Sequence, residues 1–156
     1  MKSRIVFQFL FFALSFYCFG AGMMDSLVAY HSWNFVNSED FPLMHQESGT
    51  RIIRVYVWPA LLMTIITIIM IWKRPHNIPK SWFLFVLGFQ LIVWLSSIFI
   101  QIPIQFHLDK IRDEEALQRL LITDWIRIIA WLFDIVIVST MLYRILAANA
   151  VQQKRA

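Results

Sequence analysis

Residues 82–101 read WFLFVLGFQLIVWLSSIFIQ, a run of twenty positions without a charged side chain. The hydrocarbon core of a bilayer is about 30 Å thick and a helix rises about 1.5 Å per residue, so about 20 apolar residues cross it. Lipid offers no hydrogen-bond partner to the backbone, whereas an α-helix satisfies its own backbone groups. This stretch therefore predicts a membrane-spanning helix.

Three further apolar runs of comparable length flank this stretch. We expect helices at about residues 5–24, 52–73, 81–102 and 124–146. Ser38, followed by Glu39 and Asp40, indicates an N-cap and an acidic first turn, so an amphipathic helix is predicted to lead into the second run. Pro103 is expected to end or kink the third helix. The predicted fold is an all-α, integral membrane four-helix bundle.

The composition indicates the same class of protein. Hydrophobic residues make up 59% of the 156 positions and charged residues 15%, whereas soluble domains contain about 25% charged residues. A soluble protein is therefore excluded, and we expect one transmembrane domain over residues 1–156. The net charge of +4 does not indicate nucleic-acid binding, because the basic residues flank apolar runs. Cys18 is the single cysteine, which excludes an intramolecular disulfide.

The first apolar run has a second interpretation. Lys2 and Arg4 followed by apolar residues resemble the charged and hydrophobic regions of a secretory signal. However, the run is long for a signal, and no small-x-small cleavage site follows it. A first membrane helix is therefore the preferred prediction.

The orientation follows from the basic residues near the helix ends. One side of the membrane would carry, without any acidic residue, the side chains of Lys2, Arg4, Lys73, Arg74, Lys80, Arg144, Lys154 and Arg155. The two other connections also contain basic residues, but they hold nine of the ten acidic residues. Because cytoplasmic loops are enriched in Lys and Arg, we expect both termini in the cytoplasm. A functional site is expected on the opposite, far side.

Polar side chains within the third run share one helical face. They are Gln90, Trp94, Ser97, Gln101 and Gln105, spaced 4, 3, 4 and 4 residues apart. We call these five residues the polar seam. One interpretation is hydrogen bonding between helices, which holds a membrane bundle together. The other is a surface that lines a ligand site.

The fourth run adds a second polar face, with Arg127, Trp131 and Asp134 at spacings of 4 and 3. Asp134 would lie about 15 Å into a helix that starts near Asp124. A carboxylate at this depth costs about 2.5–3.5 kcal/mol on insertion scales, so Asp134 is expected to be protonated or paired with a group from another helix. A structural pairing and a role in proton handling or ligand binding are both left open.

Two further arginines precede the second run. Glu47 and Arg51 form an i, i+4 pair, and Arg54 follows one turn later, which is typical of a salt-bridged helix end. Alternatively, Arg51, Arg54 and Arg127 gather at the far-side mouth of the bundle. Their guanidinium groups would then bind an anionic or carbonyl group of a ligand.

The histidines His31, His45 and His107 are predicted to lie on the same side of the membrane. Neutral imidazole is a common ligand of transition metals, so they could form a metal or haem site. None of them is paired at i, i+4 and no cysteine accompanies them, so polar surface residues are the alternative. The cofactor is unknown, and a protein without one is preferred over a haem or metal protein.

Three short motifs resemble a known family. They are Phe41-Pro42-x-x-His45, Pro103-x-Gln105-x-x-Leu108 and Trp125-x-Arg127. In order and spacing they resemble the small four-helix membrane proteins that include the anthrone oxygenases of polyketide pathways. The resemblance implies a four-helix bundle and an oxygenase-like activity on an aromatic molecule. It also implies a site at His45, Gln105, Trp125 and Arg127.

Two classes of function follow. The first is a membrane enzyme, oxygenase-like or redox, whose far-side pocket binds an apolar aromatic or quinone-like molecule. The predicted catalytic residues are His45, Gln105, Arg127 and Asp134, and the predicted ligand-binding residues are Arg51, Arg54, Trp94, Gln101 and Trp125. The second class is a non-catalytic subunit or assembly factor of a membrane complex, in which the polar faces serve packing.

The partners and location follow from the same analysis. We expect the lipid bilayer, together with an apolar small molecule or other membrane subunits, and leave a homo-oligomer open. The predicted location is a membrane that the chain crosses several times, which is the inner membrane if the source is bacterial.

Overall fold

The computed structural model describes residues 2–153, and these form an all-helical bundle. Lys154 and Arg155 lie outside the described residues. Four helical spans are long and apolar enough to cross a membrane: Arg4–Phe35, Phe41–Lys73, Lys80–Leu108 and Glu114–Val151. We call them spans 1 to 4. The protein is therefore a polytopic membrane protein, as its composition predicted.

Three of the spans are built from several helical segments. Span 1 contains α1 (Lys2–Met24), η1 (Asp25–Ala29), α2 (Tyr30–Ser32) and η2 (Trp33–Phe35). Span 2 contains α3 (Phe41–Ile52), η3 (Ile53–Val57) and α4 (Trp58–Lys73). Span 3 contains α5 (Lys80–Ser96), η4 (Ser97–Gln101) and α6 (Ile102–Leu108). Span 4 is the single helix α7 (Glu114–Gln153).

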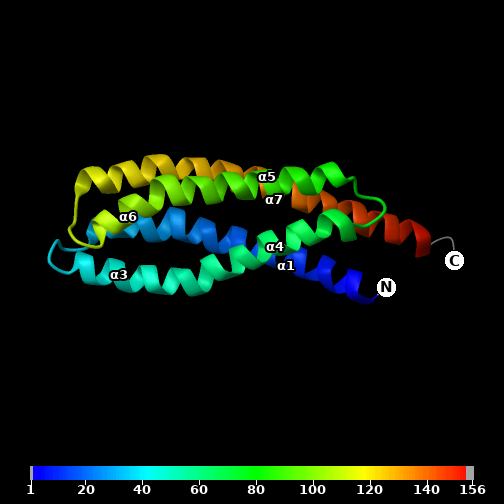
Figure 1. Cartoon of the computed structure of the whole chain (residues 1–156), viewed down its shortest axis with the longest axis horizontal. Helices are drawn as coiled ribbons and strands as arrows, with labels where there is room; N and C mark the ends of the chain where they lie inside the picture. The colour runs from blue at the N-terminus through cyan, green and yellow to red at the C-terminus, as the bar shows by residue number, and fades with distance from the viewer. Residues whose placement is uncertain (1, 154–156) are drawn as a thin grey trace.

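The four spans lie side by side along one long axis (Figure 1). Span 1 packs against span 2, span 2 against span 3, span 3 against span 4, and span 4 against span 1. Both ends of the described chain and the loop 74–79 lie at one end of the bundle, which we call the terminal end. The connections 36–40 and 109–113 lie at the opposite end, which we call the loop end.

The helices extend beyond the predicted boundaries. The first helix continues past residue 24 to Phe35, the second begins at Phe41, the third ends at Leu108, and the fourth begins at Glu114. Hydropathy predicts only the part of a helix that lipid surrounds. Beyond the lipid the helix can continue through polar residues, because water or other protein groups form hydrogen bonds with them. Asp40, rather than Ser38, is the N-cap residue of α3, and its side chain makes no capping hydrogen bond.

Three π-helical turns interrupt the spans, namely η1, η3 and η4. Pro59 and Pro103 follow η3 and η4 within two residues, and neither can donate a backbone hydrogen bond. Pro59 frees the carbonyl of Val55, which accepts a hydrogen bond from the Tyr17 hydroxyl at 2.7 Å. Pro103 was predicted to end or kink the third helix. The helix does not end there, because α6 continues to Leu108 after the π turn η4.

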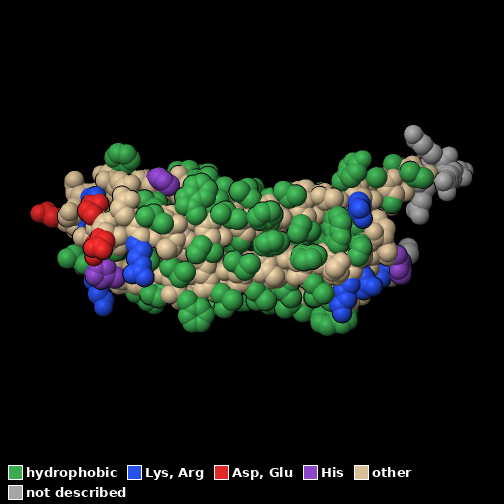
Figure 2. Space-filling view, turned by 90° about the horizontal axis from the view of Figure 1, so that it is seen from above, with side chains coloured by type: hydrophobic (Ala, Val, Ile, Leu, Met, Phe, Trp, Pro, Cys, Tyr) green, Lys and Arg blue, Asp and Glu red, His purple; other side chains and the backbone are tan. Residues whose placement is uncertain are grey.

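Two apolar clusters close the interior of the bundle. Near the terminal end, Phe11, Met70 and Phe83 are fully buried in one cluster. Near the loop end, Phe41, Leu108 and Leu120 are fully buried in another. Hydrophobic side chains also cover the middle of the outer surface, and charged side chains show at the two ends (Figure 2). This distribution fits a bundle with lipid around its middle.

Gly22 allows spans 1 and 4 to approach closely. A Cβ atom at Gly22 would meet the Trp131 ring at 2.8 Å, whereas a Cβ at Gly20 would meet nothing within 4 Å.

We expect Gly22→Ala to destabilise the protein by about 1–3 kcal/mol through overpacking. The matched Gly20→Ala should be neutral or stabilise a helical position by up to about 1 kcal/mol. Thermal unfolding in detergent measures both; equal effects would contradict the close contact.

Candidate functional site

A central cavity of about 110 Å³ lies between the four spans. Its apolar lining comes mainly from spans 2 and 3 and includes Ile52, Val57, Ala60, Met63, Phe89, Val93 and Ile102. Its polar lining comes from all four spans and includes Asp25, Tyr30, Gln90, Gln105, Arg127 and Asp134. A mostly apolar cavity with a few converging polar groups is the usual form of a small-molecule site.

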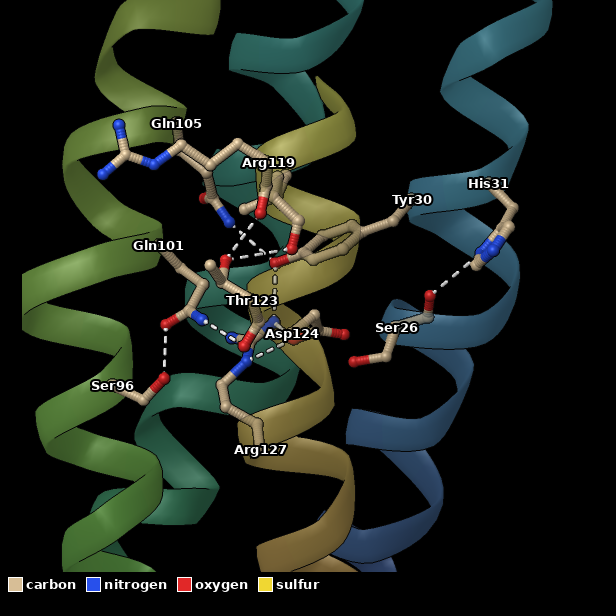
Figure 3. Close-up of polar contacts among 11 residues, drawn as sticks. Ser26, Tyr30, His31, Ser96, Gln101, Gln105, Arg119, Thr123, Asp124 and Arg127 are labelled. Atoms are coloured by element: carbon tan, nitrogen blue, oxygen red, sulfur yellow. Dashed lines mark hydrogen bonds and ion pairs between the residues drawn. The ribbon is translucent and has the colours of Figure 1, made fainter. Parts of the chain in front are cut away.

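The Tyr30 hydroxyl joins spans 1, 3 and 4 (Figure 3), and Tyr30 lines the central cavity. Gln105 of α6 donates its Nε2 hydrogen to the Tyr30 oxygen at 2.7 Å, and Arg127 of α7 donates from Nη2 at 3.0 Å. The phenolic oxygen therefore accepts two hydrogen bonds, which leaves its own hydrogen available as a donor. Gln105 and Arg127 were both predicted to be site residues, and the structure brings them together.

Arg127 is neutralised by an acid on its own helix. Its side chain is 5% exposed, its Nε donates to Asp124 Oδ1 at 2.5 Å, and Nη2 contacts the same oxygen. Asp124 lies one helical turn before Arg127, and it is also buried. A buried ion pair is stable only when the remaining donors are satisfied as well, and Tyr30 contributes to that. Within residues 2–153, Nη1 of Arg127 has no hydrogen-bond partner.

The polar seam lines the cavity and also connects helices. All five of its residues border the cavity. Gln90 donates to Thr67 Oγ1 at 3.0 Å, and Trp94 donates to Thr64 Oγ1 at 3.0 Å. Gln101 accepts from Ser96 at 3.0 Å and donates to the Thr123 carbonyl at 3.3 Å. The two interpretations of the seam therefore coexist, because the same side chains hold the bundle and surround the cavity.

Two residues that line the cavity carry unpaired polar atoms. Asp134 Oδ1 and Gln90 Oε1 are buried without a hydrogen-bond partner in the described part of the chain. The expected partner of Asp134 from another helix is therefore not present for this oxygen. An unsatisfied buried polar atom costs about 1–3 kcal/mol, so both atoms favour a bound molecule or water that would complete them.

His45 lies beside a second cavity of about 240 Å³, which we call the side cavity. Its Nδ1 pairs with Asp109 Oδ1 at 2.6 Å, and the ring is enclosed by Trp33 and Phe41 at centroid distances of 4.7 and 5.5 Å. His45 is 3% exposed, and its Nε2 is buried without a described partner. The two cavities share lining residues, namely Asp25, Tyr30, Ile52 and Gln105.

The structure leaves three other predicted residues away from the central cavity. Arg51 pairs with Glu47 at 2.9 Å on the surface and borders only the side cavity. The Arg54 side chain is exposed, so the three arginines do not gather around one ligand. Trp125 is 55% exposed and borders a shallow hollow beside His31. These side chains lie on helix faces that point outward, which the resemblance and the spacing did not reveal.

The three histidines predicted as metal ligands are held apart. His31 Nδ1 lies 3.3 Å from the Ser26 carbonyl oxygen, and His107 Nε2 lies 2.8 Å from Asp113. The hydrogen bond from His107 lowers the pKa of the Asp113 carboxyl below its usual value. Within residues 2–153, no three side chains of His, Cys, Asp or Glu are grouped so that they could bind a metal ion. The three-histidine site is therefore not formed.

Two residues of the candidate site, Tyr30 and Asp124, were not predicted. Asp25 and Tyr30 follow the end predicted for the first helix, and the π turn η1 carries this helix into the site. Asp124 was interpreted as the start of the fourth helix, whereas it lies inside α7. The i, i+3 spacing of Asp124 and Arg127 was the signal that could have identified the pair.

Comparison of the chain with known protein families, curated proteins and solved structures finds no match. The candidate site therefore rests on the contacts, burial and charge of the chain's own residues.

The Tyr30 hydroxyl provides a test of the network. We expect Tyr30→Phe to destabilise the protein by about 1–3 kcal/mol, because Gln105 and Arg127 each lose an acceptor. Tyr143→Phe is the matched control, since Tyr143 is exposed and makes no hydrogen bond in the described chain. Thermal unfolding in detergent compares the two variants. Equal stabilities would show that the Tyr30 hydroxyl does not hold the spans together.

Proposed function

We propose that this membrane protein binds an apolar aromatic or quinone-like molecule in the central cavity. Arg127 carries the proposal, because its buried guanidinium is fixed by Asp124 and Tyr30, its Nη1 makes no hydrogen bond in the described chain, and the residue lines the mostly apolar central cavity. A fixed cationic donor in a dry cavity polarises a carbonyl oxygen more strongly than a donor in water. The protein would act as a redox or oxygenase-like enzyme on the polarised ring.

The size of the cavity supports a ligand with one ring. Its volume of about 110 Å³ is of the same order as an engineered protein cavity of about 150 Å³ that binds benzene. The ring would lie among the apolar residues of spans 2 and 3. A first carbonyl would accept hydrogen bonds from Arg127 and the Tyr30 hydroxyl. A second polar group would bind to Asp134 and Gln90.

His45 is the proposed proton carrier. Asp109 holds its Nδ1, which leaves Nε2 as the nitrogen that exchanges a proton with a group in the side cavity. A carboxylate that orients an imidazole in this way is a common arrangement in general acid–base catalysis. The side cavity shares Tyr30 and Gln105 with the central cavity, so a proton path between the two would be short.

The proposed orientation places the loop end on the far side of the membrane and both termini in the cytoplasm. The loop 74–79 and its flanking residues Lys73 and Lys80 carry basic side chains without acidic ones, in agreement with the enrichment of Lys and Arg in cytoplasmic loops. The site would then lie in the half of the membrane away from the cytoplasm, which is the periplasmic half if the source is bacterial.

The alternative is a non-catalytic subunit or assembly factor. The connections 36–40, 74–79 and 109–113 are too short to form a soluble domain, which suits a protein that acts through its membrane surface. This alternative predicts co-purification of another membrane protein at fixed stoichiometry after mild detergent extraction. It gives no reason for the unpaired polar atoms in the cavity.

Binding of decylubiquinone to the protein in lipid vesicles tests the proposal. Trp94 and Trp131 line the cavity, so a bound quinone should quench tryptophan fluorescence with saturation. Arg127→Lys keeps the charge beside Asp124 but loses the guanidinium donors. We expect it to weaken binding by about 10- to 100-fold, equivalent to a charged hydrogen bond of about 1.5–3 kcal/mol.

Arg119→Lys is the matched control, because Arg119 is exposed on the same helix and does not line the central cavity. It should bind as the wild type does. Non-saturable quenching by the wild type, or equal affinity of the Arg127→Lys variant, would contradict the proposed site.

A further inference from the structure

Spans 2 and 3 separate beside the central cavity. Towards the terminal end they are joined by the hydrogen bonds from Gln90 to Thr67 and from Trp94 to Thr64, each 3.0 Å long. At the loop end they are joined again, where Gln46 donates to the Asp109 carbonyl at 2.7 Å. Between these two levels, no hydrogen bond in the described chain joins residues 47–63 to residues 95–108.

The interruptions of the helices account for this separation. Both spans carry a π turn at this level, η3 in span 2 and η4 in span 3, and each turn is followed by a proline. A proline and a π turn both bend a helix, and they let two neighbouring helices diverge. Figure 1 draws α3 along the lower edge of the bundle and α6 nearer its middle, with span 1 between them in this view. Span 4, in contrast, packs closely against η4 and α6.

The residues at this separation are apolar and reach the lipid-facing surface. Ile52, Val57 and Ile102 all line the cavity, and Ile102 is also 39% exposed. Exposed apolar side chains flank them, namely Ile53 of η3, Ile98 and Phe99 of η4 and Phe106 of α6, and Arg54 of η3 is exposed beside Ile53. The side chains of Ile52, Val57 and Ile102 offer no hydrogen bonds to replace those of water, so an entrance that they border suits an apolar molecule better than a hydrated one.

The two ends of the bundle are closed by packing. The cluster of Phe41, Leu108 and Leu120 fills the loop end, and the cluster of Phe11, Met70 and Phe83 fills the terminal end. Arg112 also donates to the Val36 and Asn34 carbonyls, which ties the two connections of the loop end together. In the described chain, these clusters leave a molecule in the central cavity two exits, the apolar one between spans 2 and 3 and the side cavity, with which it shares Asp25, Tyr30, Ile52 and Gln105.

We infer that the ligand enters from the bilayer through the opening between spans 2 and 3, which is bordered by Ile52, Val57 and Ile102. The inference rests on the proposed function and names its substrate class as a membrane-dissolved molecule with a polar ring and an apolar tail. The ring occupies the central cavity, and the tail remains between the helices and in the lipid. The cavity volume of about 110 Å³ leaves no room for a long tail inside.

The experiment compares binding rates with affinity. The full chain in phosphatidylcholine vesicles is mixed with decylubiquinone, and quenching of tryptophan fluorescence is followed in time. The variant Val57→Phe/Ile102→Phe narrows the opening, and the variant Ile53→Phe/Ile98→Phe places the same side chains on the same turns away from the cavity. Phenylalanine adds no tryptophan signal, so the optical reading is unchanged.

A narrowed entrance slows association and dissociation alike. For Val57→Phe/Ile102→Phe we expect the association rate to fall by about tenfold, whereas the control variant keeps wild-type rates. Because both residues also line the cavity, the Kd rises as well, and the slowed association is the reading that identifies the entrance. Ile102→Ala should raise both rates, which keeps the test decisive if the larger substitutions disturb folding. These results would support entrance from the bilayer.

Other outcomes would overturn the inference in distinguishable ways. Unchanged rates in both Ile102 variants, with binding intact, would place the route elsewhere, for example through the side cavity. A weaker Kd with unchanged association would make Val57 and Ile102 part of the binding surface rather than of an entrance. An absence of saturable binding to the wild-type protein would overturn the proposed function together with this inference.

Discussion

The charge of Arg127, buried between membrane helices, determines the arrangement of the polar interior. A guanidinium retains its charge, so in a low-dielectric interior it requires a counter-ion and an oxygen acceptor for its donors. Asp124 provides the counter-ion from the preceding turn of α7, and the Tyr30 hydroxyl provides an acceptor from span 1. Because Gln105 binds the same hydroxyl, spans 1, 3 and 4 are held in one relative position. The central cavity is lined by Arg127, Tyr30 and Gln105.

The three π-helical turns explain how regular helices can surround such an interior. Each turn inserts one residue into a helix, which changes the direction of the following side chains. Residues of all three turns line the cavity, among them Asp25, Tyr56 and Ser97. The turns at η3 and η4 precede prolines, so part of their cause lies in the missing backbone donors.

The same residues pack the helices of this bundle together and line its central cavity. The donors of Gln90, Trp94 and Gln101 are used between or within helices, so these residues stabilise the site rather than compete for a ligand. The groups left unpaired are few, and they include Asp134 Oδ1, Gln90 Oε1 and His45 Nε2. Unsatisfied buried atoms are rare in proteins, and these three all lie on residues that border a cavity. The hydrogen-bonded atoms of these residues thus hold the structure together, whereas the buried atoms without a hydrogen-bond partner are the candidate functional groups.

The sequence alone determined the number of spans and the polar faces of the third and fourth helices, because the thickness of the bilayer and the helical period act on any chain in the same way. It therefore also predicted Gln105, Arg127 and Asp134 as inward-facing residues. Only the tertiary structure decided that Tyr30 joins Gln105 to Arg127 and that His45 meets Asp109. It also decided that Arg51 and Arg54 stay on the surface. Such pairings depend on the rotation and depth of each helix relative to its neighbours. The π turns change the rotation and the depth of the helices, and the hydropathy pattern does not predict where π turns occur.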